Sequence, residues 1–366
     1  MRPWEKNIRQ VVPYVPGEQP AGDKIVKLNT NENPYPPAPG VKKVLEEMEA
    51  DRLRKYPDPT ASILVKELAS YYGLNEDQVF VGVGSDDVLA MSFLTFFNSD
   101  KPVLFPDVTY SFYKVWADLF KVPFETPVLK EDFTIDVKDY EKENGGVIFP
   151  NPNAPTGVYM PLDQVEEILK ANQDVVVIVD EAYVDFAGPS ALELLDKYEN
   201  LLVVQTFSKS RSMAGMRIGF AMGHPDLIRA LNDVKYSYNS YTMNLPSLLA
   251  GVEAVKDKEY FEKTIEKIVA TREHAKKRLT ELGFTFPNSQ SNFIFASHKS
   301  VPAEKIFEAL KKEQIYVRYF KTPGLDNSLR ISIGTDEEMD TLFRFLKHIY
   351  PMPERKMIEW INISCV

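Results

Sequence analysis

The fold class follows from one stretch of the chain, Leu201-Leu202-Val203-Val204-Gln205-Thr206-Phe207-Ser208-Lys209. It begins with consecutive apolar residues, and polar side chains follow them directly. A strand without apolar–polar alternation is typical of a parallel sheet that is covered by helices on both faces. The segment 175–180 has the same form, an aliphatic run that ends at Asp180. Both stretches therefore predict an α/β fold.

Short apolar runs alternate with amphipathic segments on both sides of this stretch, from residue 41 onward. Strands are expected at 79–83, 102–105, 146–149, 175–180, 201–205 and 218–222, and helices at 41–55, 61–72, 86–97 and 111–120. A long helix expected at 258–282 precedes strands at 292–296, 315–317 and 329–333 and helices at 302–313 and 336–349. The pattern predicts a large domain with a mainly parallel sheet and a smaller α+β domain.

Four segments are expected along the chain. Residues 1–40 contain eight prolines and little periodicity, which predicts an irregular N-terminal arm. Apolar and aromatic side chains within the arm favour its packing on the small domain or on a partner subunit. Residues 41–260 are expected to form the large domain and 261–350 the small domain, while the tail, 351–366, has no assignment.

Composition excludes several classes of function. The chain has 43 Lys and Arg against 53 Asp and Glu, a net charge of −10, which disfavours nucleic-acid binding. No apolar run approaches the roughly 20 residues that cross a bilayer, and the N-terminal residues lack an apolar signal segment. Cys365 is the only cysteine and the four histidines are scattered, so we expect no disulfide scaffold and no metal site. These features fit a protein of the cytoplasm.

One motif could hold a phosphate group. Gly82-Val83-Gly84-Ser85-Asp86-Asp87 follows an expected strand and opens an expected helix. It lacks the third glycine of a dinucleotide fingerprint, but the free N–H groups and the dipole of a helix N-terminus favour an anion. The alternative is a tight turn in which Asp86 caps the helix, and the motif alone does not decide between the two.

Further polar residues follow the other strands. Asn151-Pro152-Asn153-Ala154-Pro155-Thr156-Gly157 makes a rigid loop where ligand crevices of α/β sheets lie, although it could be an ordinary turn. Asp180 at a strand end either pairs structurally or meets a cationic ligand atom such as a protonated pyridine nitrogen. Lys209 is either a surface lysine or a desolvated amine nucleophile, with hydroxyls and Arg217 nearby for a phosphate monoester.

Taken together, a carboxylate for a pyridine nitrogen, a lysine amine and a phosphate cradle are the groups that pyridoxal 5′-phosphate requires. The sequence resembles the fold-type I, aspartate-aminotransferase-like enzymes that use this cofactor, and within them the histidinol-phosphate aminotransferases. The resemblance runs from about residue 8 to residue 350 and rests on the following motifs: Pro13-Tyr14-Val15-Pro16-Gly17, Lys27-Leu28-Asn29-Thr30-Asn31-Glu32-Asn33-Pro34, Tyr56-Pro57-Asp58, Gly84-Ser85-Asp86, the 151–157 loop, Asp180-Glu181-Ala182-Tyr183, Thr206-Phe207-Ser208-Lys209 and Leu329-Arg330-Ile331. It implies a mainly parallel seven-stranded sheet in the large domain and a homodimer.

The resemblance also implies roles for residues at the cofactor. Lys209 would bind the cofactor as an imine and then move protons, while Asp180 would keep the pyridine nitrogen protonated. Tyr183 would hydrogen-bond the phenolic oxygen of the cofactor, and Tyr110 would stack on its ring. The cofactor phosphate would be held by Gly84, Ser85, Asp86 (through its backbone), Thr206, Ser208, Arg217 and, from the partner subunit, Tyr56.

Substrate contacts are implied in the same way. Arg330 would bind an α-carboxylate, and Arg318 would bind the phosphate of an imidazole substrate. Tyr14 and Asn33 would help to close the site. One position departs from the family, which usually has asparagine where this chain has Ala154. Asn153 is expected to supply the missing contact to the cofactor, with Asn151 as the alternative.

The resemblance implies transamination between histidinol phosphate and 2-oxoglutarate, which belongs to histidine biosynthesis. Two other reactions on the same scaffold stay open, namely aromatic amino-acid transamination and decarboxylation of a phosphorylated amino acid. A non-catalytic regulator that binds the cofactor is a third reading. It is disfavoured because a regulator of this kind normally carries a fused DNA-binding domain, and the 40 proline-rich residues before the core leave no room for one.

Overall fold

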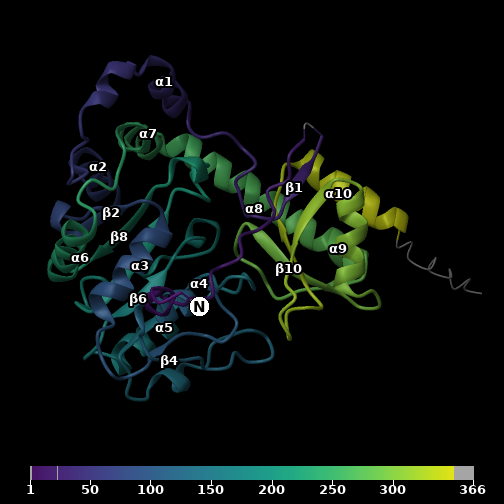
Figure 1. Ribbon diagram of the computed structural model, residues 1–366. Helices are drawn as coiled ribbons and strands as arrows, with labels where there is room; N and C mark the ends of the chain where they lie inside the picture. Colours follow the sequence, from purple (N-terminus) through teal and green to yellow (C-terminus); the bar gives the residue numbers. More distant parts are fainter. Residues whose placement is uncertain (1, 23, 350–366) are drawn as a thin grey trace, which may run out of the picture.

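The computed structural model describes residues 2–22 and 24–349, which form two sheets with their covering helices (Figure 1). The helix α8 (Lys258–Glu281) runs from the helices of the larger sheet to the smaller sheet. The expected tail, 351–366, lies outside the described residues. Among the described residues, no helix has both the length and the apolar composition needed to cross a bilayer.

The larger sheet has seven strands in the order β2-β8-β7-β6-β5-β3-β4. The strands are β2 (Val79–Gly82), β3 (Val103–Leu104), β4 (Phe124–Glu125), β5 (Gly146–Pro150), β6 (Val177–Asp180), β7 (Leu201–Thr206) and β8 (Gly219–Gly223). All neighbouring pairs are parallel except those of β8, which is antiparallel to β2 and β7. The expected seven-stranded, mainly parallel sheet is therefore confirmed.

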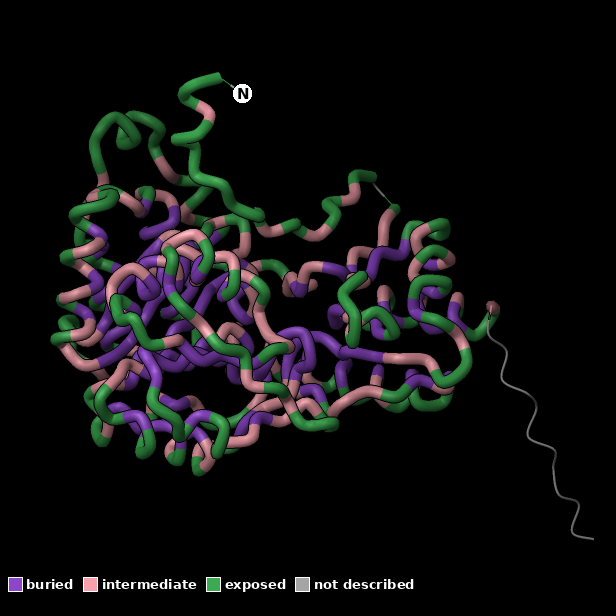
Figure 2. Tube along the Cα trace, turned by 60° about the horizontal axis from the view of Figure 1, so that its bottom comes forward, coloured by how far each residue is buried: buried purple, intermediate pink, exposed green. Residues whose placement is uncertain are grey.

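Helices cover both faces of this sheet, as the unbroken apolar runs predicted. Alternate strand residues such as Val179 and Val203 pack with α1 (Pro39–Glu47), α2 (Ser62–Tyr72), α5 (Leu162–Ala171) and α7 (Leu245–Lys256). Their neighbours Ile178 and Leu202 point the other way, toward α3 (Ser85–Phe96), α4 (Phe112–Phe120) and α6 (Pro225–Tyr238). Figure 2 shows this buried core in purple, with the first residues of the chain exposed outside it.

The smaller sheet has five strands in the order β1-β11-β12-β10-β9. They are β1 (Val26–Leu28), β9 (Phe284–Thr285), β10 (Phe293–His298), β11 (Ile315–Tyr319) and β12 (Leu329–Ser332), accompanied by α9 (Ala303–Lys312) and α10 (Asp336–Ile349). Strand β1 comes from the N-terminal arm and lies parallel to β11, with Val26 opposite Ile315. The arm thus reaches the smaller sheet some 290 residues away along the chain, as Figure 1 shows.

Some expectations about single elements were wrong. The arm is not irregular throughout, because residues 26–28 form β1; a three-residue strand is stabilised by its pairing with β11 and leaves no periodic pattern in the sequence. The helix expected at 41–55 ends at Glu47, and a short 3₁₀ turn follows at Ala50–Arg54. After Met48 the positions that would continue the apolar face are occupied by charged residues, Asp51, Arg52 and Lys55. Helices α5, α6 and α7 and strands β4 and β9 were not among the expected segments.

Candidate active site

The polar residues that follow the central strands lie at one edge of the larger sheet. Strands β5, β6 and β7 are parallel, with Pro150 opposite Asp180 and Asp180 opposite Val204. Because parallel strands end at the same edge, the 151–157 loop, Asp180 and the segment after Thr206 come together there. The turn between β2 and α3 joins them, since β2 and β7 both pair with β8.

Asp180 is a buried carboxylate at the end of β6. Its Oδ2 accepts a hydrogen bond of 2.7 Å from the hydroxyl of Tyr113, and its Oδ1 accepts one of 3.2 Å from the backbone N–H of Ala182. Within the described residues no cation pairs with it. Burial therefore raises the pKa of Asp180 to about 6, against the opposing effect of these two donors. A cationic ligand atom beside Asp180 would relieve this cost.

Lys209 lies three residues beyond the end of β7 and is half-buried. Its Nζ donates to the carbonyl oxygen of Thr30, at 3.1 Å, and lies 5.8 Å from the centre of the Tyr183 ring. The N-terminal arm therefore covers the lysine. A second contact of the arm fixes the same turn, because Nδ2 of Asn33 donates to the carbonyl oxygen of Ser210 at 3.0 Å.

The turn between β2 and α3 has the form of a phosphate cradle. Helix α3 begins at Ser85, and Gly84 precedes it with a φ of 85°, a conformation that favours glycine. A Cβ on Gly84 would lie 2.4 Å from Nη2 of Arg217, so the backbone and the guanidinium are in close approach. Asp86 does not cap the helix, since that position belongs to Gly84. The same Arg217 lies within 3.7 Å of Oδ2 of Asp86.

Hydroxyl groups complete the cradle beside β7. Thr206 Oγ1 donates to Ser208 Oγ at 3.0 Å and accepts from the backbone N–H of Ser208 at 3.2 Å. Nη1 of Arg217 donates to Ser208 Oγ at 3.5 Å. The expected phosphate-binding groups on this chain, from Gly84 to Arg217, are therefore contiguous.

Aromatic side chains connect the cradle with Asp180, since Tyr110 binds Asp86, Tyr113 binds Asp180 and the two rings are in contact. The Tyr110 hydroxyl donates to Oδ1 of Asp86 at 2.7 Å, and its ring meets that of Tyr113 edge-on at 5.7 Å. Burial and the nearby Asp86 carboxylate raise the pKa of Tyr110 well above its usual value. Tyr14 of the arm stacks on Phe112, with ring centres 4.2 Å apart.

The two arginines expected to bind substrate lie opposite each other on the smaller sheet. Arg318 of β11 pairs in register with Arg330 of β12, which places both side chains on one face. Arg330 donates from Nη2 to the carbonyl oxygen of Asn29 at 3.1 Å, while its buried Nε has no partner among the described residues. Burial and the neighbouring Arg318 lower the pKa of Arg330. This pair of cations is available to an anion.

Arg318 also holds the arm. Its Nη2 donates to the carbonyl oxygen of Val15 at 3.3 Å, and its Nη1 donates to that of Pro16 at 3.5 Å. These bonds, with β1 and Tyr14, place the arm along the edge of the arginine face.

The 151–157 loop is held by its own asparagines. Both amide hydrogens of Asn153 are engaged, one with the carbonyl oxygen of Val108 at 2.9 Å and one with Thr156 Oγ1 at 3.1 Å. Asn151 donates from Nδ2 to the carbonyl oxygen of Met160 at 2.9 Å, and its Oδ1 accepts from the backbone N–H of Met160 at 2.8 Å. These bonds disfavour the expectation that Asn153 replaces the missing asparagine, because both of its amide hydrogens are engaged, whereas Asn151 keeps one amide hydrogen without a partner among the described residues.

Tyr56 is not part of this cluster. Its side chain is 82% exposed, and its ring contacts that of Tyr241 at 4.6 Å. The structure of a single chain therefore leaves Tyr56 on the surface.

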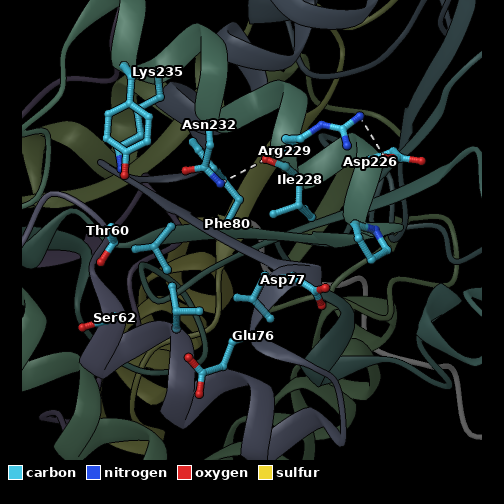
Figure 3. A pocket seen from close by; sticks show the side chains of 15 residues that line it. Thr60, Ser62, Glu76, Asp77, Phe80, Asp226, Ile228, Arg229, Asn232 and Lys235 are labelled. Atoms are coloured by element: carbon cyan, nitrogen blue, oxygen red, sulfur yellow. Dashed lines mark hydrogen bonds and ion pairs between the residues drawn. The ribbon is translucent and has the colours of Figure 1, made fainter.

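A separate hollow lies between α2, β2 and α6 (Figure 3). Its lining includes Glu76, Asp77, Arg229 and Lys235, and none of the expected site residues. Arg229 pairs with Asp226 at 2.9 Å, and Nζ of Lys235 donates to the carbonyl oxygen of Pro59. Because its cations already have partners, we assign no role to this hollow.

Sequence reasoning overlooked three contributors to the site. Tyr113 lies one helical turn after Tyr110, so helical spacing could have suggested it. Thr30 acts through its backbone carbonyl, which no sequence pattern reveals. Asn31 donates from Nδ2 to the hydroxyl of Tyr183 at 2.9 Å, although the two residues are 152 positions apart.

These residues fit pyridoxal 5′-phosphate. Asp180, which is buried and pairs with no cation in the described part of the chain, suits a pyridinium nitrogen, and the Gly84–Arg217 cradle with its hydroxyls suits a phosphate. Lys209 lies at a position covered by the arm, with its Nζ beside the ring of Tyr183. The fit to the cofactor therefore depends on several chemical groups together, a carboxylate, an amine and a set of phosphate-binding donors, and not on any one motif.

Comparison with known proteins places the chain in a family. The model of the family "Aminotransferase class I and II" matches residues 23–346. The curated histidinol-phosphate aminotransferase of Brachyspira hyodysenteriae is 52% identical over 342 residues, which are 93% of this chain and 97% of that protein. The corresponding protein of Clostridium acetobutylicum is 52% identical over 94% of this chain and 98% of its own length.

Solved structures show the same fold. The putative histidinol-phosphate aminotransferase of Erwinia carotovora atroseptica superposes with a TM-score of 0.81 and 24% identity, covering 89% of this chain and 97% of that one. The histidinol-phosphate aminotransferase of Sinorhizobium meliloti, solved in complex with pyridoxal 5′-phosphate, has a TM-score of 0.80 and 24% identity, with 88% and 91% covered.

The fold and the site thus define a pyridoxal-phosphate-dependent aminotransferase of class I and II. The expected fold class, enzyme class and cofactor are confirmed. Within this class, the chain belongs to the family of the histidinol-phosphate aminotransferases.

Proposed function

We propose that the enzyme transfers an amino group between histidinol phosphate and 2-oxoglutarate, forming imidazole-acetol phosphate and glutamate, as a step of histidine biosynthesis. The single observation that carries this substrate choice is the pair Arg318 and Arg330, which lie opposite each other on one sheet face. Two adjacent guanidinium groups suit a doubly charged phosphate better than an uncharged aromatic side chain.

Lys209, Asp180 and Tyr183 form the catalytic group in this proposal. When bound, pyridoxal 5′-phosphate supplies an electron sink for the bond broken at the substrate's Cα. Asp180 would keep a proton on the pyridine nitrogen, which is supported by the burial of its carboxylate without a paired cation among residues 2–22 and 24–349. Lys209 would hold the cofactor through Nζ and then move the proton at Cα. The hydroxyl of Tyr183 would bind the phenolic oxygen, and Tyr110 would cover the ring.

Binding of the cofactor phosphate would use the cradle around Gly84. Ser85 and Asp86 would donate backbone N–H groups from the first turn of α3, where the helix dipole favours an anion. The remaining contacts would come from Thr206, Ser208 and Arg217. Asn153 would act by fixing the 151–157 loop, because its amide donates to the carbonyl oxygen of Val108 outside the loop and to Thr156 within it.

The substrate would enter between the arginine face and the arm. Arg330 would bind the α-carboxylate of glutamate as a fork, and its unpartnered Nε supports this role. Arg318 would bind the phosphate of histidinol phosphate. Tyr14 and Asn33 would close the site from the arm, which their contacts with Phe112 and Ser210 support.

We also propose a cytoplasmic homodimer, with Tyr56 reaching the cofactor phosphate of the partner subunit. The exposed position of Tyr56 supports this, because a tyrosine in that position is free to meet a second chain. In the same proposal, residues 1–40 act as an arm, 41–260 as the cofactor-binding domain and 261–350 as the small domain.

The test is a half-reaction screen. The purified enzyme, loaded with pyridoxal 5′-phosphate, is mixed with one amino donor at a time, and the absorbance of the cofactor is followed. We expect histidinol phosphate and glutamate to convert the cofactor to its amino form at low concentration. Conversion by tyrosine or phenylalanine with none by histidinol phosphate would favour the aromatic aminotransferase. Release of carbon dioxide from a phosphorylated amino acid would favour the decarboxylase.

A further inference from the structure

Tyr183 has an unusual hydrogen-bond partner in the N-terminal arm. Just after β1, Asn31 donates from Nδ2 to the Tyr183 hydroxyl at 2.9 Å. Asn31 is 1% exposed and Tyr183 is 9% exposed, so water does not compete for this bond. The bond joins an arm residue to a residue that follows β6 of the larger sheet.

The orientation of the Asn31 amide is set by the smaller sheet. Its Oδ1 accepts a hydrogen bond of 3.0 Å from Ser332 Oγ, and that same Oγ accepts one of 2.9 Å from the Asn31 backbone N–H. With the amide oxygen turned toward Ser332, the NH₂ group must face Tyr183. The backbone of Asn31 has a φ of 58°, a left-handed conformation that asparagine and aspartate tolerate better than other non-glycine residues.

The polarity of this bond matters. A tyrosine hydroxyl has one hydrogen and can accept at its oxygen. Because the oxygen accepts from Asn31, the hydrogen remains free, and no acceptor for it is found among the described residues. A hydroxyl that already accepts a hydrogen bond is also a stronger donor. Asn31 therefore prepares the Tyr183 hydroxyl to donate.

The amide that the family usually supplies for the phenolic oxygen of the cofactor is missing in this chain. Ala154 stands where the family usually has asparagine, and it packs in the same apolar cluster as Tyr183. Both amide hydrogens of Asn153 are engaged, with Val108 and Thr156, and the amide of Asn151 is tied to the backbone of Met160 through its oxygen and one hydrogen. Tyr183 then supplies a larger share of the hydrogen bonding to that oxygen, which makes its orientation more important in this chain.

We propose that Asn31 is a positioning residue, which aims the Tyr183 hydroxyl hydrogen at the phenolic oxygen of the cofactor and compensates for the asparagine absent at position 154. This inference rests on the proposed function, because it requires the cofactor to lie beside Tyr183. In this proposal the N-terminal arm orients a cofactor-binding side chain in addition to covering the substrate.

The test is Asn31→Asp, which keeps the size of the side chain and tolerates the same backbone. A carboxylate at this position would accept the Tyr183 hydrogen and turn it away from the cofactor. Without that donor the phenolic oxygen holds the proton on the neighbouring Lys209 nitrogen more tightly. We therefore expect the midpoint of the cofactor's visible pH titration to rise by about one unit, a tenfold change. Tyr183→Phe should raise it by a similar amount.

A double variant shows whether Asn31→Asp acts by turning the Tyr183 hydroxyl or only by adding a negative charge near the cofactor. In the Tyr183→Phe background, Asn31→Asp should add little, because there is no hydroxyl left to turn. Asn29→Ala is the matched control, since Asn29 is a buried arm residue whose amide donates to the carbonyl oxygen of Glu18 and does not contact Tyr183. Its midpoint should equal that of the wild type. Ser332→Ala, which frees the Asn31 amide to rotate, should give a smaller rise.

The inference is overturned if Asn31→Asp leaves the midpoint unchanged, or if it shifts the midpoint equally with and without the Tyr183 hydroxyl. If Asn31→Asp folds poorly, Ser332→Ala becomes the test. An unchanged midpoint of the titration in Ser332→Ala would then contradict the inference. Failure of the proposed function looks different, since histidinol phosphate would then not convert the cofactor in the half-reaction screen, while the cofactor band of the wild-type protein would still titrate.

Discussion

Asp180 shows how a single residue links stability to cofactor binding. Its carboxylate is buried at the end of β6 with two neutral donors and no paired cation among the described residues, and its pKa is raised to about 6. A raised pKa means that the folded protein holds a proton that the unfolded chain releases. The stabilising contribution is therefore complete below the unfolded value near 3.8 and is lost as the pH rises through about 6.

The first prediction concerns the cofactor-free protein between pH 4 and 8. Its free energy of unfolding should fall as the pH rises, with about 3 kcal/mol of that fall due to Asp180. Glu181, whose pKa burial raises to about 7, adds to the same slope. Urea unfolding across this pH range measures the whole fall in the free energy of unfolding. The difference between the wild type and Asp180→Asn gives the share of that fall that is due to Asp180.

Loading with pyridoxal 5′-phosphate should remove the Asp180 part of that slope, because a protonated pyridine nitrogen stabilises the carboxylate. An Asp180→Asn protein with the same pH profile as the wild type, in the cofactor-free form, would contradict the account of this residue.

The second prediction concerns Lys209. Lys209→Ala should keep the fold but lose the covalently held yellow cofactor, and turnover should fall by several orders of magnitude. General acid–base help alone is worth about 10²- to 10⁴-fold, and covalent catalysis is lost as well. Circular dichroism and steady-state kinetics check the two parts. Near-normal turnover in the variant would contradict the assignment.

The third prediction concerns Arg318. Arg318→Ala should lower kcat/KM for histidinol phosphate by about 10² or more, at roughly 1.5–3 kcal/mol for each hydrogen bond to a charged group. The half-reaction with glutamate, which has no phosphate, should fall much less. Arg229→Ala is the matched control, since Arg229 pairs on the surface with Asp226.

Equal small losses with both substrates would mean that Arg318 only holds the carbonyl groups of Val15 and Pro16. Thermal unfolding of the variant tells whether that arm contact contributes to stability.

At the scale of single elements, the phosphate cradle depends on how closely two elements approach. Strand β8 runs against the turn that opens α3, and Gly219 makes this contact possible. A Cβ at position 219 would lie 2.2 Å from both the carbonyl carbon of Gly84 and the backbone nitrogen of Ser85. Because both are backbone atoms, no side-chain rotation can relieve the overlap.

The fourth prediction is that Gly219→Ala displaces the cradle. It should lower stability by about 1–3 kcal/mol, as overpacking does, and weaken the affinity for pyridoxal 5′-phosphate by more than tenfold. Titration with the cofactor, followed by absorbance, measures the affinity. Gly215→Ala is the matched control, because nothing lies within 4 Å of a Cβ there. Identical affinities of the two variants would show that the cradle tolerates the shift.

At the scale of the whole molecule, the surface position of Tyr56 bears on the proposed dimer. The side chain is 82% exposed, far more than expected for a residue that serves the site of its own chain. A two-fold dimer is the commonest arrangement of soluble homo-oligomers, and it would carry each Tyr56 toward the other subunit.

The fifth prediction tests that arrangement by mixing two inactive variants, Lys209→Ala and Tyr56→Ala. In a hybrid dimer one site combines the intact Lys209 of one subunit with the intact Tyr56 of the other. Activity should therefore return, up to about a quarter of wild type for random mixing of two-fold dimers. No recovery despite confirmed subunit exchange would place Tyr56 in its own chain, and sedimentation showing an active monomer would exclude the dimer.

Much of the fold was predictable because it depends on local patterns. The unbroken apolar runs of β6 and β7 require cover on both faces, which led directly to a parallel sheet with helices around it. The short strand β1 was not predictable in this way. Its three residues carry no period, and only pairing with β11, nearly 290 positions later, makes them a strand.

In the site, too, some features follow from the local sequence and others depend on long-range contacts. By itself the sequence determined the class of chemistry, since Asp180, Lys209 and the glycine turn are each tied to a strand end, and strand ends meet at one edge of a parallel sheet. Only the tertiary structure decided the partners: Tyr113 for Asp180, Thr30 for Lys209 and Asn31 for Tyr183. The reason is physical, because a hydrogen bond depends on distance and direction in space, and the arm that supplies two of these partners is distant in sequence from the strands it covers.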